Sequence, residues 1–289
     1  MAKVLIVGGD GLIGGMLVRG FAARGWEIVD TTRRPSASMN STVYLDLADP
    51  DARRAPLPAA DVAIFAAAMS RFADCRASPA LARAVNTDVP VALAERLARQ
   101  GTRSILISTS AVFDGSRPRV SADAPPAPTS LYGTLKAKAE CGFLALSDLG
   151  GIVRLTKVLD PSHLLFTRWR SALVRNERIG AFADLRLAPI TLADVETAVL
   201  TVADGGKILQ VSALGDLSYY EAAVHLARAL GKPATLVDSL SAADAGIPES
   251  DRPLYTSLDT AELAFRTSWE PPHPLDVIES VFVRGPRLA

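Results

Sequence analysis

The sequence is short of the residues that build disulfide scaffolds and metal centres. Its 289 residues include two cysteines, Cys75 and Cys141, and three widely separated histidines. It contains no CxxC pair and no HExxH spacing. These absences exclude a disulfide-stapled secreted domain and the common zinc motifs, and we expect no metal in the functional site.

An excess of charge and a long apolar run are also missing. The 31 basic and 31 acidic side chains cancel to a formal net charge of zero. That balance is not typical of a general nucleic-acid binder or of a protein held on an anionic membrane. No apolar run reaches the roughly 18 residues of a membrane span, and the first residues lack a signal-peptide pattern. The sequence therefore predicts a cytoplasmic protein that binds neither nucleic acid nor membrane.

The first half of the chain alternates short apolar runs with segments of helical periodicity. This alternation predicts an α/β fold, a doubly wound parallel sheet of the Rossmann type with helices on both faces. We expect strands at residues 3–7, 26–31, 42–45, 61–66, 103–108 and 151–155. We expect helices at residues 12–24, 79–100 and 130–149, the first ended by Gly25 and the second divided at Pro90.

The second half is less regular and richer in proline. It predicts helices at residues 161–179, 191–202 and 218–230, and a strand at 207–212. Ser218 and Glu221 form a capping-box pattern at the start of the last helix. We expect a nucleotide-binding domain over residues 1–159, to which 187–212 return, and a small C-terminal lobe mainly over 160–289.

The first expected strand runs directly into a glycine-rich turn that also opens the first helix. Gly8, Gly11 and Gly14 are spaced GxxGxxG. They suit a tight turn, a close approach of the backbone to a pyrophosphate, and close packing of helix on strand. The N–H groups at the start of the helix, at Leu12 and Ile13, favour phosphate binding. The motif predicts a dinucleotide site; the alternative is an ordinary turn between a strand and a helix.

Arg33 and Arg34 follow the second expected strand. An acidic side chain at this place binds the ribose of NAD, whereas arginine suits the 2′-phosphate of NADP. Asp30 lies too early, inside the strand. We therefore expect NADP as the cofactor, with NAD possible; the alternative is that both arginines are solvated.

Two later segments are further candidates for cofactor contacts. Asp46 and Leu47, after the third strand, are expected beside the adenine, with a solvated loop as the alternative. The small side chains of Ala66, Ala67 and Ala68, after the fourth strand, would let a ligand lie against the backbone, with tight packing as the alternative.

Tyr132 and Lys136 are four residues apart and project from one face of an expected helix. An ammonium beside a phenol favours the phenolate; moving the phenol pKa from about 10 to about 7 takes roughly 4 kcal/mol. Hydroxyl groups at the end of the fifth strand, in Ser108-Thr109-Ser110, are suited to hydrogen-bond a substrate oxygen. Alone the pair is a weak signal, but together with the glycine turn and this hydroxyl cluster it predicts proton transfer.

These motifs together resemble the extended short-chain dehydrogenase/reductase family, and within it the dTDP-4-dehydrorhamnose reductase branch. The resemblance covers nearly the whole chain and rests on GGDGLIGG, AAA, STSAVFDG and YGTLK, with weaker support from residues 188–194 and 252–260. It implies that Tyr132 is the general acid/base and that Lys136 lowers its pKa and binds a ribose. It also implies that the Thr109 hydroxyl faces the substrate and that Asn86 supports the site.

The chain departs from the family pattern at two places. Ser110 stands where the rhamnose reductases carry an aspartate, and with Ala111 it replaces the acid pair of the sugar-nucleotide dehydratases, which disfavours dehydration. Phe65 stands where an asparagine usually precedes the alanines, which alters one cofactor contact.

The resemblance implies an NADP-preferring reductase that passes a hydride to a keto group of a nucleotide-linked sugar. An epimerase that retains its cofactor and a non-catalytic NADP-binding regulatory subunit are the alternatives. Ser110, Arg168 and Arg252 are the expected substrate-binding residues, with Arg168 on a basic helix suited to a diphosphate. A solvated helical face is the alternative for that helix, and a homodimer paired through helices of the first half is also expected.

Overall fold

The computed structural model describes residues 1–35 and 41–284, which form two compact units. Unit 1 contains residues 1–112, 126–154 and 196–209, and unit 2 contains 113–125, 155–195 and 210–284 of the described chain. The segment 113–125, which we expected in the first domain, belongs to unit 2. The part that returns to unit 1 is 196–209, within the expected 187–212.

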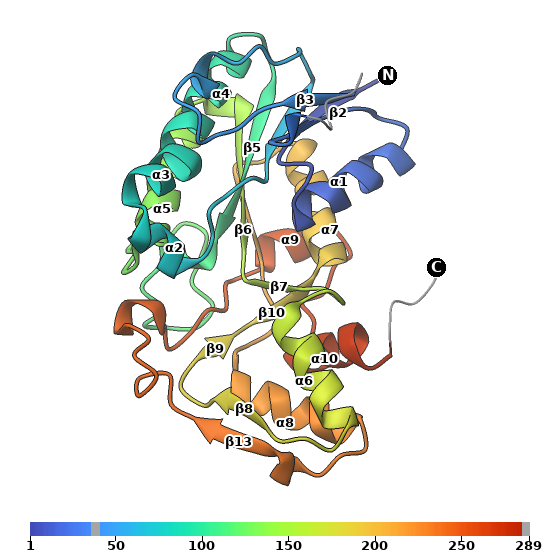
Figure 1. Ribbon diagram of the computed structural model, residues 1–289. Helices are drawn as coiled ribbons and strands as arrows, with labels where there is room; N and C mark the ends of the chain where they lie inside the picture. The colour runs from blue at the N-terminus through green and yellow to red at the C-terminus, as the bar shows by residue number, and fades with distance from the viewer. Residues whose placement is uncertain (36–40, 285–289) are drawn as a thin grey trace. The chain divides into compact units, whose positions relative to one another are not determined.

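A seven-stranded sheet forms the frame of unit 1 (Figure 1). Its strands lie in the order β3 (Thr42–Tyr44), β2 (Glu27–Thr32), β1 (Lys3–Val7), β4 (Val62–Phe65), β5 (Arg103–Thr109), β6 (Gly150–Leu155) and β11 (Ile208–Val211). The pairs β1–β2, β1–β4, β2–β3 and β4–β5 are all parallel. The order 3-2-1-4-5-6 is that of the dinucleotide-binding α/β fold, so the expected fold class is confirmed.

Helices cover both faces of this sheet (Figure 1). One side carries α1 (Leu12–Ala23) and α7 (Leu192–Ala203), which an ion pair of 2.6 Å between Arg24 and Glu196 joins. The other side carries α2 (Phe72–Ala77), α3 (Pro79–Arg83), α4 (Val89–Ala98) and α5 (Leu131–Leu144). Apolar side chains of β1, β4, β5, α4 and α5 form one continuous core.

The local signals for helix ends act as expected in unit 1. Gly25 follows α1 with φ +76°, the left-handed conformation that ends a helix. Pro90 divides the expected long helix: α3 passes through a π-helical turn at Ala84–Asp88 before α4 begins. Proline has no N–H and crowds the carbonyl four residues earlier, so the wider turn accommodates it. The expected helix 130–149 ends earlier, at Leu144, and a short 3-10 turn covers Ser147–Leu149.

Unit 2 combines four helices with short two-stranded sheets in its described residues. The helices are α6 (Leu164–Val174), α8 (Tyr219–Ala229), α9 (Ala261–Arg266) and α10 (Pro274–Phe282). The sheets pair β7 (Lys157–Leu159) with β10 (Pro189–Thr191), β8 (Ile179–Phe182) with β13 (Val237–Leu240), and β9 (Arg186–Leu187) with β12 (Leu217–Ser218). Phe166 of α6 stacks on Phe282 of α10 at 4.9 Å between ring centroids, inside the core of this unit.

The expected helix 161–179 is too long. Helix α6 ends at Val174 because Asn176 adopts φ +60°, and Ile179 already belongs to β8. Asparagine is the residue that most often replaces glycine at this helix-ending position. The capping box of Ser218 and Glu221 at the start of α8 is confirmed.

Within the described ranges, no helix is both long and apolar enough to cross a membrane. The same residues contain no group of three His, Cys, Asp or Glu side chains that could hold a metal ion.

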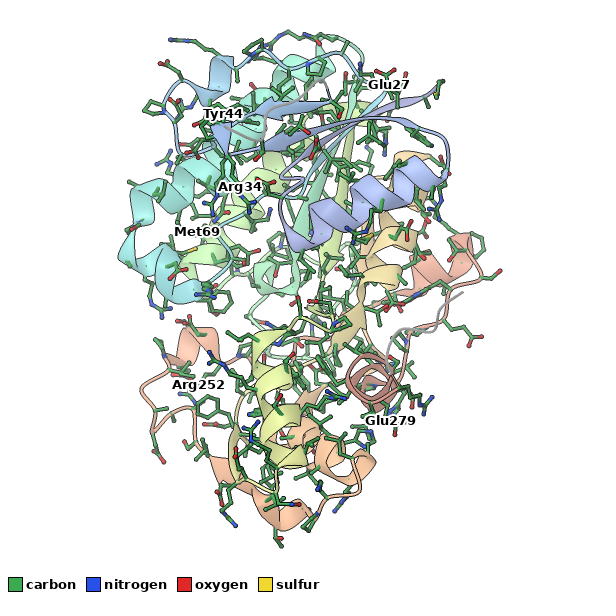
Figure 2. The ribbon with its side chains drawn as sticks, turned by 45° about the vertical axis from the view of Figure 1, so that its right-hand side comes forward. Glu27, Arg34, Tyr44, Met69, Arg252 and Glu279 are labelled. Carbon is green, nitrogen blue, oxygen red and sulfur yellow. The ribbon has the colours of Figure 1, made fainter. Side chains whose placement is uncertain are left out.

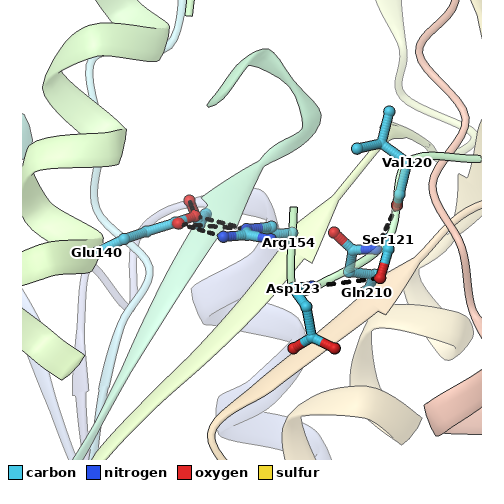
Figure 3. Close-up of polar contacts among 7 residues, drawn as sticks. Val120, Ser121, Asp123, Glu140, Arg154 and Gln210 are labelled. Atoms are coloured by element: carbon cyan, nitrogen blue, oxygen red, sulfur yellow. Dashed lines mark hydrogen bonds and ion pairs between the residues drawn. The ribbon is translucent and has the colours of Figure 1, made fainter. Parts of the chain in front are cut away.

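A buried ion pair ties α5 to the sheet of unit 1. Glu140 and Arg154 are 1% and 2% exposed, and their closest contact is 2.7 Å. Figure 3 shows the carboxylate and the guanidinium facing each other. The Ser108 hydroxyl donates to the same carboxylate at 2.5 Å. The two buried charges thus compensate each other, and Glu140 lies one helical turn beyond Lys136.

We predict that Glu140→Gln lowers the free energy of unfolding by about 3 kcal/mol, because it removes the carboxylate that compensates the buried charge of Arg154. Chemical denaturation at pH 7 measures this loss. The matched control is Glu27→Gln, which removes a half-exposed carboxylate 2.8 Å from Lys3; it should cost less than about 1 kcal/mol. Equal losses in the two variants would contradict the role assigned to the Glu140–Arg154 pair.

Candidate functional site

The glycine turn joins β1 to α1 through a tightly folded backbone. Gly8 has φ +97°, and its N–H donates to the Thr31 hydroxyl of β2 at 3.0 Å. A Cβ on Gly14 would overlap the carbonyl oxygen of Gly8, so α1 begins directly against the turn. Gly11 is the N-cap residue and has no side chain to cap the helix.

The start of α1 suits a phosphate group. The first N–H groups of an α-helix have no partner within the helix, and the helix dipole places positive charge there. Leu12 is exposed and Ile13 is partly exposed, so this end of the helix is open. The glycines of the turn have no side chains that would keep a ligand from the backbone, and the start of α1 has no side-chain cap. Both features fit the pyrophosphate of a dinucleotide.

Arg33 and Arg34 lie just after β2, and both are exposed. Asp30 lies inside β2, as expected, where it accepts a hydrogen bond of 2.7 Å from the Thr42 hydroxyl. The Arg34 Nε lies 4.0 Å from Oδ2 of Asp10, an acid in the glycine turn that sequence reasoning did not single out. Within the part of the chain that the structure describes, Arg33 makes no ion pair.

The segment after β3 contributes one polar and one apolar residue. Asp46 accepts a hydrogen bond of 3.0 Å from the Ala48 N–H, which stabilises the loop. Leu47 is 6% exposed and packs in the core of unit 1. Core packing leaves little of the Leu47 surface for an adenine ring. Asp46 is more exposed than Leu47, so of these two candidates it is the better placed to contact an adenine.

The alanines after β4 link the glycine turn to the rest of the site. The N–H groups of Ala66 and Ala67 both donate to the carbonyl oxygen of Val7, at 2.9 and 3.0 Å. A Cβ on Gly8 would lie 2.8 Å from Ala67, so the turn packs directly on this segment. Ala68 is exposed, and Phe65 before the alanines is buried in the core.

Asn86 fixes the next residue of this segment, Met69. Its side-chain oxygen accepts from the Met69 N–H and its amide donates to the Met69 carbonyl, both at 2.9 Å. Asn86 itself is 1% exposed and lies in the π-helical turn before α4. This double contact fixes the backbone of Met69, a target that sequence alone did not identify; the role of Asn86 in supporting the site stays a prediction.

Tyr132 and Lys136 lie on the buried face of α5. Ser130 caps the helix by accepting from the Gly133 N–H at 3.1 Å. A Cβ on Gly133 would overlap the carbonyl oxygen of Ala111, so α5 packs closely on the turn after β5. Tyr132 is 8% exposed and Lys136 is 1% exposed.

The phenol of Tyr132 meets the hydroxyl of Thr109 at the end of β5. Burial raises the pKa of Tyr132 above its usual value, nearby Cys75 adds to this rise, and a hydrogen bond with the Thr109 side chain offsets a smaller part of it. The Phe72 ring lies 5.7 Å from the tyrosine ring, between centroids. Phe72 and Cys75 come from the short helix α2, which the sequence analysis missed.

Lys136 is a buried cation. Burial lowers the pKa of Lys136 to about 8, and the neighbouring carboxylate of Glu140 raises it in part. Over residues 1–35 and 41–284, no hydrogen bond or ion pair holds the ammonium group; Glu140 pairs instead with Arg154. The ammonium group is therefore buried at a cost to stability and is free to act on a ligand or on Tyr132.

The expected substrate residues are spread over both units. Ser110 begins the 3-10 turn Ser110–Val112 directly after Thr109, in unit 1. Arg168 is exposed on α6 of unit 2. Arg252, also in unit 2, donates to the Ile247 carbonyl at 3.0 Å and lies 3.6 Å from Asp184, so part of its guanidinium is already occupied. Arg175 and Arg178 fall within the expected helix 161–179 but lie beyond the end of α6, where they pair with Glu177 and Asp238.

The fold of unit 1 and these residues define a class: a dinucleotide-binding α/β protein with a buried tyrosine–lysine pair beside a strand-end threonine. The family model of the RmlD substrate binding domain matches residues 2–282, and the chain belongs to this family. The expected placement in the dTDP-4-dehydrorhamnose reductase-like branch is thereby confirmed.

Three known proteins show how far the similarity extends. A probable low-salt glycan biosynthesis reductase, Agl14 of Haloferax volcanii, is 26% identical over 270 residues, 89% of this chain and 90% of that protein. A dTDP-4-dehydrorhamnose reductase of Mycobacterium tuberculosis is 27% identical over 273 residues, 91% and 86% of the two chains. The crystal structure of the Bacillus anthracis dTDP-4-dehydrorhamnose reductase in complex with NADP superposes with a TM-score of 0.82 at 21% identity, over 98% of this chain and 100% of that one.

We predict that Lys136→Met stabilises the cofactor-free protein at pH 7 by up to about 3 kcal/mol, because the wild-type fold must keep a charge buried. The pKa of Lys136 is lower in the folded chain than in the unfolded chain, so the unfolded state holds the proton more tightly. The penalty is therefore complete below about pH 8 and fades as pH rises toward the unfolded value near 10.4.

Urea denaturation at pH 7 and at pH 9.5 measures the difference in the free energy of unfolding between wild type and Lys136→Met. The two pH values span most of the range of roughly two pH units over which the penalty fades. The stability gain should shrink at the higher pH. A gain that is the same at both pH values, or a loss at pH 7, would contradict the buried charge.

Proposed function

We propose that this protein is an NAD(P)-dependent oxidoreductase that reduces a keto group of a sugar linked to a nucleoside diphosphate. The observation that carries the proposal is the buried ammonium of Lys136, which has no hydrogen-bond or ion-pair partner among the described residues and lies one helical turn from a buried phenol. A buried charge costs stability, so the fold gains nothing from it unless it acts on a ligand or on Tyr132. The relatives named as reductases support the same reaction class.

The glycine turn, the start of α1 and the alanines after β4 would hold the dinucleotide. When bound, the nicotinamide supplies the hydride for the reduction. Tyr132 would donate its proton to the keto oxygen, and the Thr109 hydroxyl would hydrogen-bond the same oxygen. The raised pKa of Tyr132 keeps the phenol protonated at neutral pH in the cofactor-free protein, which is the form a proton donor needs.

Lys136 would stabilise the tyrosinate that remains after proton transfer. With a pKa of about 8, Lys136 is mostly protonated at pH 7, about ten to one. Its charge is therefore in place when Tyr132 loses its proton, and the low-dielectric surroundings strengthen the attraction. Lys136 would also donate to a ribose hydroxyl of the cofactor.

The substrate is proposed as a class. The names of the relatives point to a 4-keto sugar on a nucleoside diphosphate. Ser110, beside Thr109, offers a hydroxyl where the rhamnose reductases carry an aspartate, so the particular sugar is left open within this class. Arg168 and Arg252 stay predictions as diphosphate ligands, and pairing of two chains also stays a prediction.

We predict that Tyr132→Phe lowers turnover by a factor of about 10³ or more, because it removes the proposed proton donor. The measurement is NADPH oxidation with dTDP-4-keto and UDP-4-keto sugars. NADPH affinity, from nucleotide fluorescence, should remain within about threefold. Tyr219→Phe, which removes a phenol from α8 of unit 2, is the control and should retain turnover.

The same assay separates the three candidate functions. A reductase oxidises one NADPH for each sugar reduced. Sugar conversion without net NADPH oxidation would show an epimerase, and NADPH binding without any conversion would show a non-catalytic binder. Turnover that survives Tyr132→Phe would contradict the proposed proton donor.

A further inference from the structure

The glycine turn places a carboxylate at the end of β2. Oδ2 of Asp10 accepts a hydrogen bond of 2.5 Å from the hydroxyl of Thr32, the last residue of that strand. The same oxygen lies 4.0 Å from Nε of Arg34, which is labelled in Figure 2. The Thr32 hydroxyl in turn accepts from the Arg34 N–H at 3.0 Å. Asp10, Thr32 and Arg34 thus form one cluster.

This cluster lies where a dinucleotide-binding fold contacts the adenosine ribose of its cofactor. The residues that follow the second strand contact the ribose of the adenosine: a carboxylate accepts from the ribose 2′-hydroxyl, whereas an arginine pairs with a 2′-phosphate. Here β2 is followed by arginines, and the carboxylate comes from the glycine turn, 22 residues earlier in the chain.

A second acid at this end of the sheet, Asp30, is already occupied. Asp30 accepts from the Thr42 hydroxyl through Oδ1, and its Oδ2 lies so close to Gly9 that a Cβ there would overlap it. Asp30 therefore points at the backbone of the turn. Asp10 differs: its side chain is 33% exposed, and its Oδ1 makes no hydrogen bond to any residue that the structure describes.

We propose that Asp10 is a cofactor-specificity residue. Its free oxygen accepts a hydrogen bond from a ribose 2′-hydroxyl, and its charge opposes a 2′-phosphate and partly occupies Arg34. Arg33, exposed and without an ion pair among the described residues, is left as the cation that attracts the 2′-phosphate. The site thus carries groups for both NAD and NADP, and Asp10 reduces the preference for NADP that the two arginines alone would give.

This inference rests on the dinucleotide site of the proposed function, but not on the reaction. Its test therefore uses two probes that lack nicotinamide: ADP, which carries the 2′-hydroxyl, and 2′,5′-ADP, which carries the 2′-phosphate. Titration calorimetry on the full chain gives the affinity for each probe. The informative quantity is the ratio of the two affinities in each variant.

Asp10→Asn should tighten 2′,5′-ADP by about threefold to tenfold, because repulsion is removed and Arg34 is released. It should weaken ADP by about threefold, because an amide is a poorer acceptor than a carboxylate. Arg33→Ala should do the reverse, weakening 2′,5′-ADP about tenfold and ADP less than twofold. Asp10→Ser, which also removes the charge, should shift the ratio in the same direction as Asp10→Asn.

Asp30→Asn is the matched control, because it removes a carboxylate from the same end of the sheet that does not point at the ribose position. It should leave the ratio within about twofold. An unchanged ratio in both Asp10 variants, or an equal change in Asp30→Asn, would overturn the inference. If the wild type binds neither probe, the dinucleotide site itself fails. If both probes bind as expected but no keto sugar is reduced, only the proposed reaction fails.

Discussion

The site depends on one constraint, the burial of the Lys136 ammonium beside the Tyr132 phenol. The fold places both on the inner face of α5, and Glu140, the nearest carboxylate on that face, is taken by Arg154. A fully compensated lysine would be held in place but would have little influence on a neighbouring phenol. The Glu140–Arg154 pair therefore has two effects: it joins α5 to β6, and it leaves the charge of Lys136 only partly compensated.

The remaining parts of the site are linked to this pair by one short segment. Residues 66–69 follow β4, pack under the glycine turn at Ala67, and are fixed at Met69 by Asn86. Met69 packs in the same apolar cluster as Tyr132. Residues 66–69 thus contact the turn that suits a pyrophosphate at one end and, through Met69, the apolar cluster that contains Tyr132 at the other. Rigid support of this kind is what precise positioning of two reacting groups requires.

The sequence predicts the frame of unit 1 well, because its signals are local. The strand at residues 3–7, the helix end at Gly25 and the break before Pro90 each follow from a few neighbouring residues. The capping box at Ser218 and Glu221 is of the same kind. Tyr132 and Lys136 were also predictable, since helical spacing alone puts them on one face.

Contacts between distant segments were not predictable. Three such contacts depend on how the strands are ordered in the sheet. They are the ion pair between Glu140 and Arg154, the hydrogen bonds between Asn86 and Met69, and the hydrogen bond between Thr32 and Asp10. The short strands of unit 2 were missed because two to four residues carry too little periodicity. The end of α6 was misjudged although Asn176 carried a signal for it.

The most direct test of the account is the ionisation of Tyr132, followed by ultraviolet difference spectroscopy as wild type minus Tyr132→Phe. In the cofactor-free protein the pKa of Tyr132 should lie above that of free tyrosine, about 10. With saturating NADP⁺, whose nicotinamide ring carries a positive charge, the pKa of Tyr132 should fall below that value, and Lys136→Met should raise the pKa of Tyr132 in the NADP⁺ complex by removing the second cation. A titration of Tyr132 that NADP⁺ leaves unchanged would contradict the claim that this buried pair faces the reacting centre.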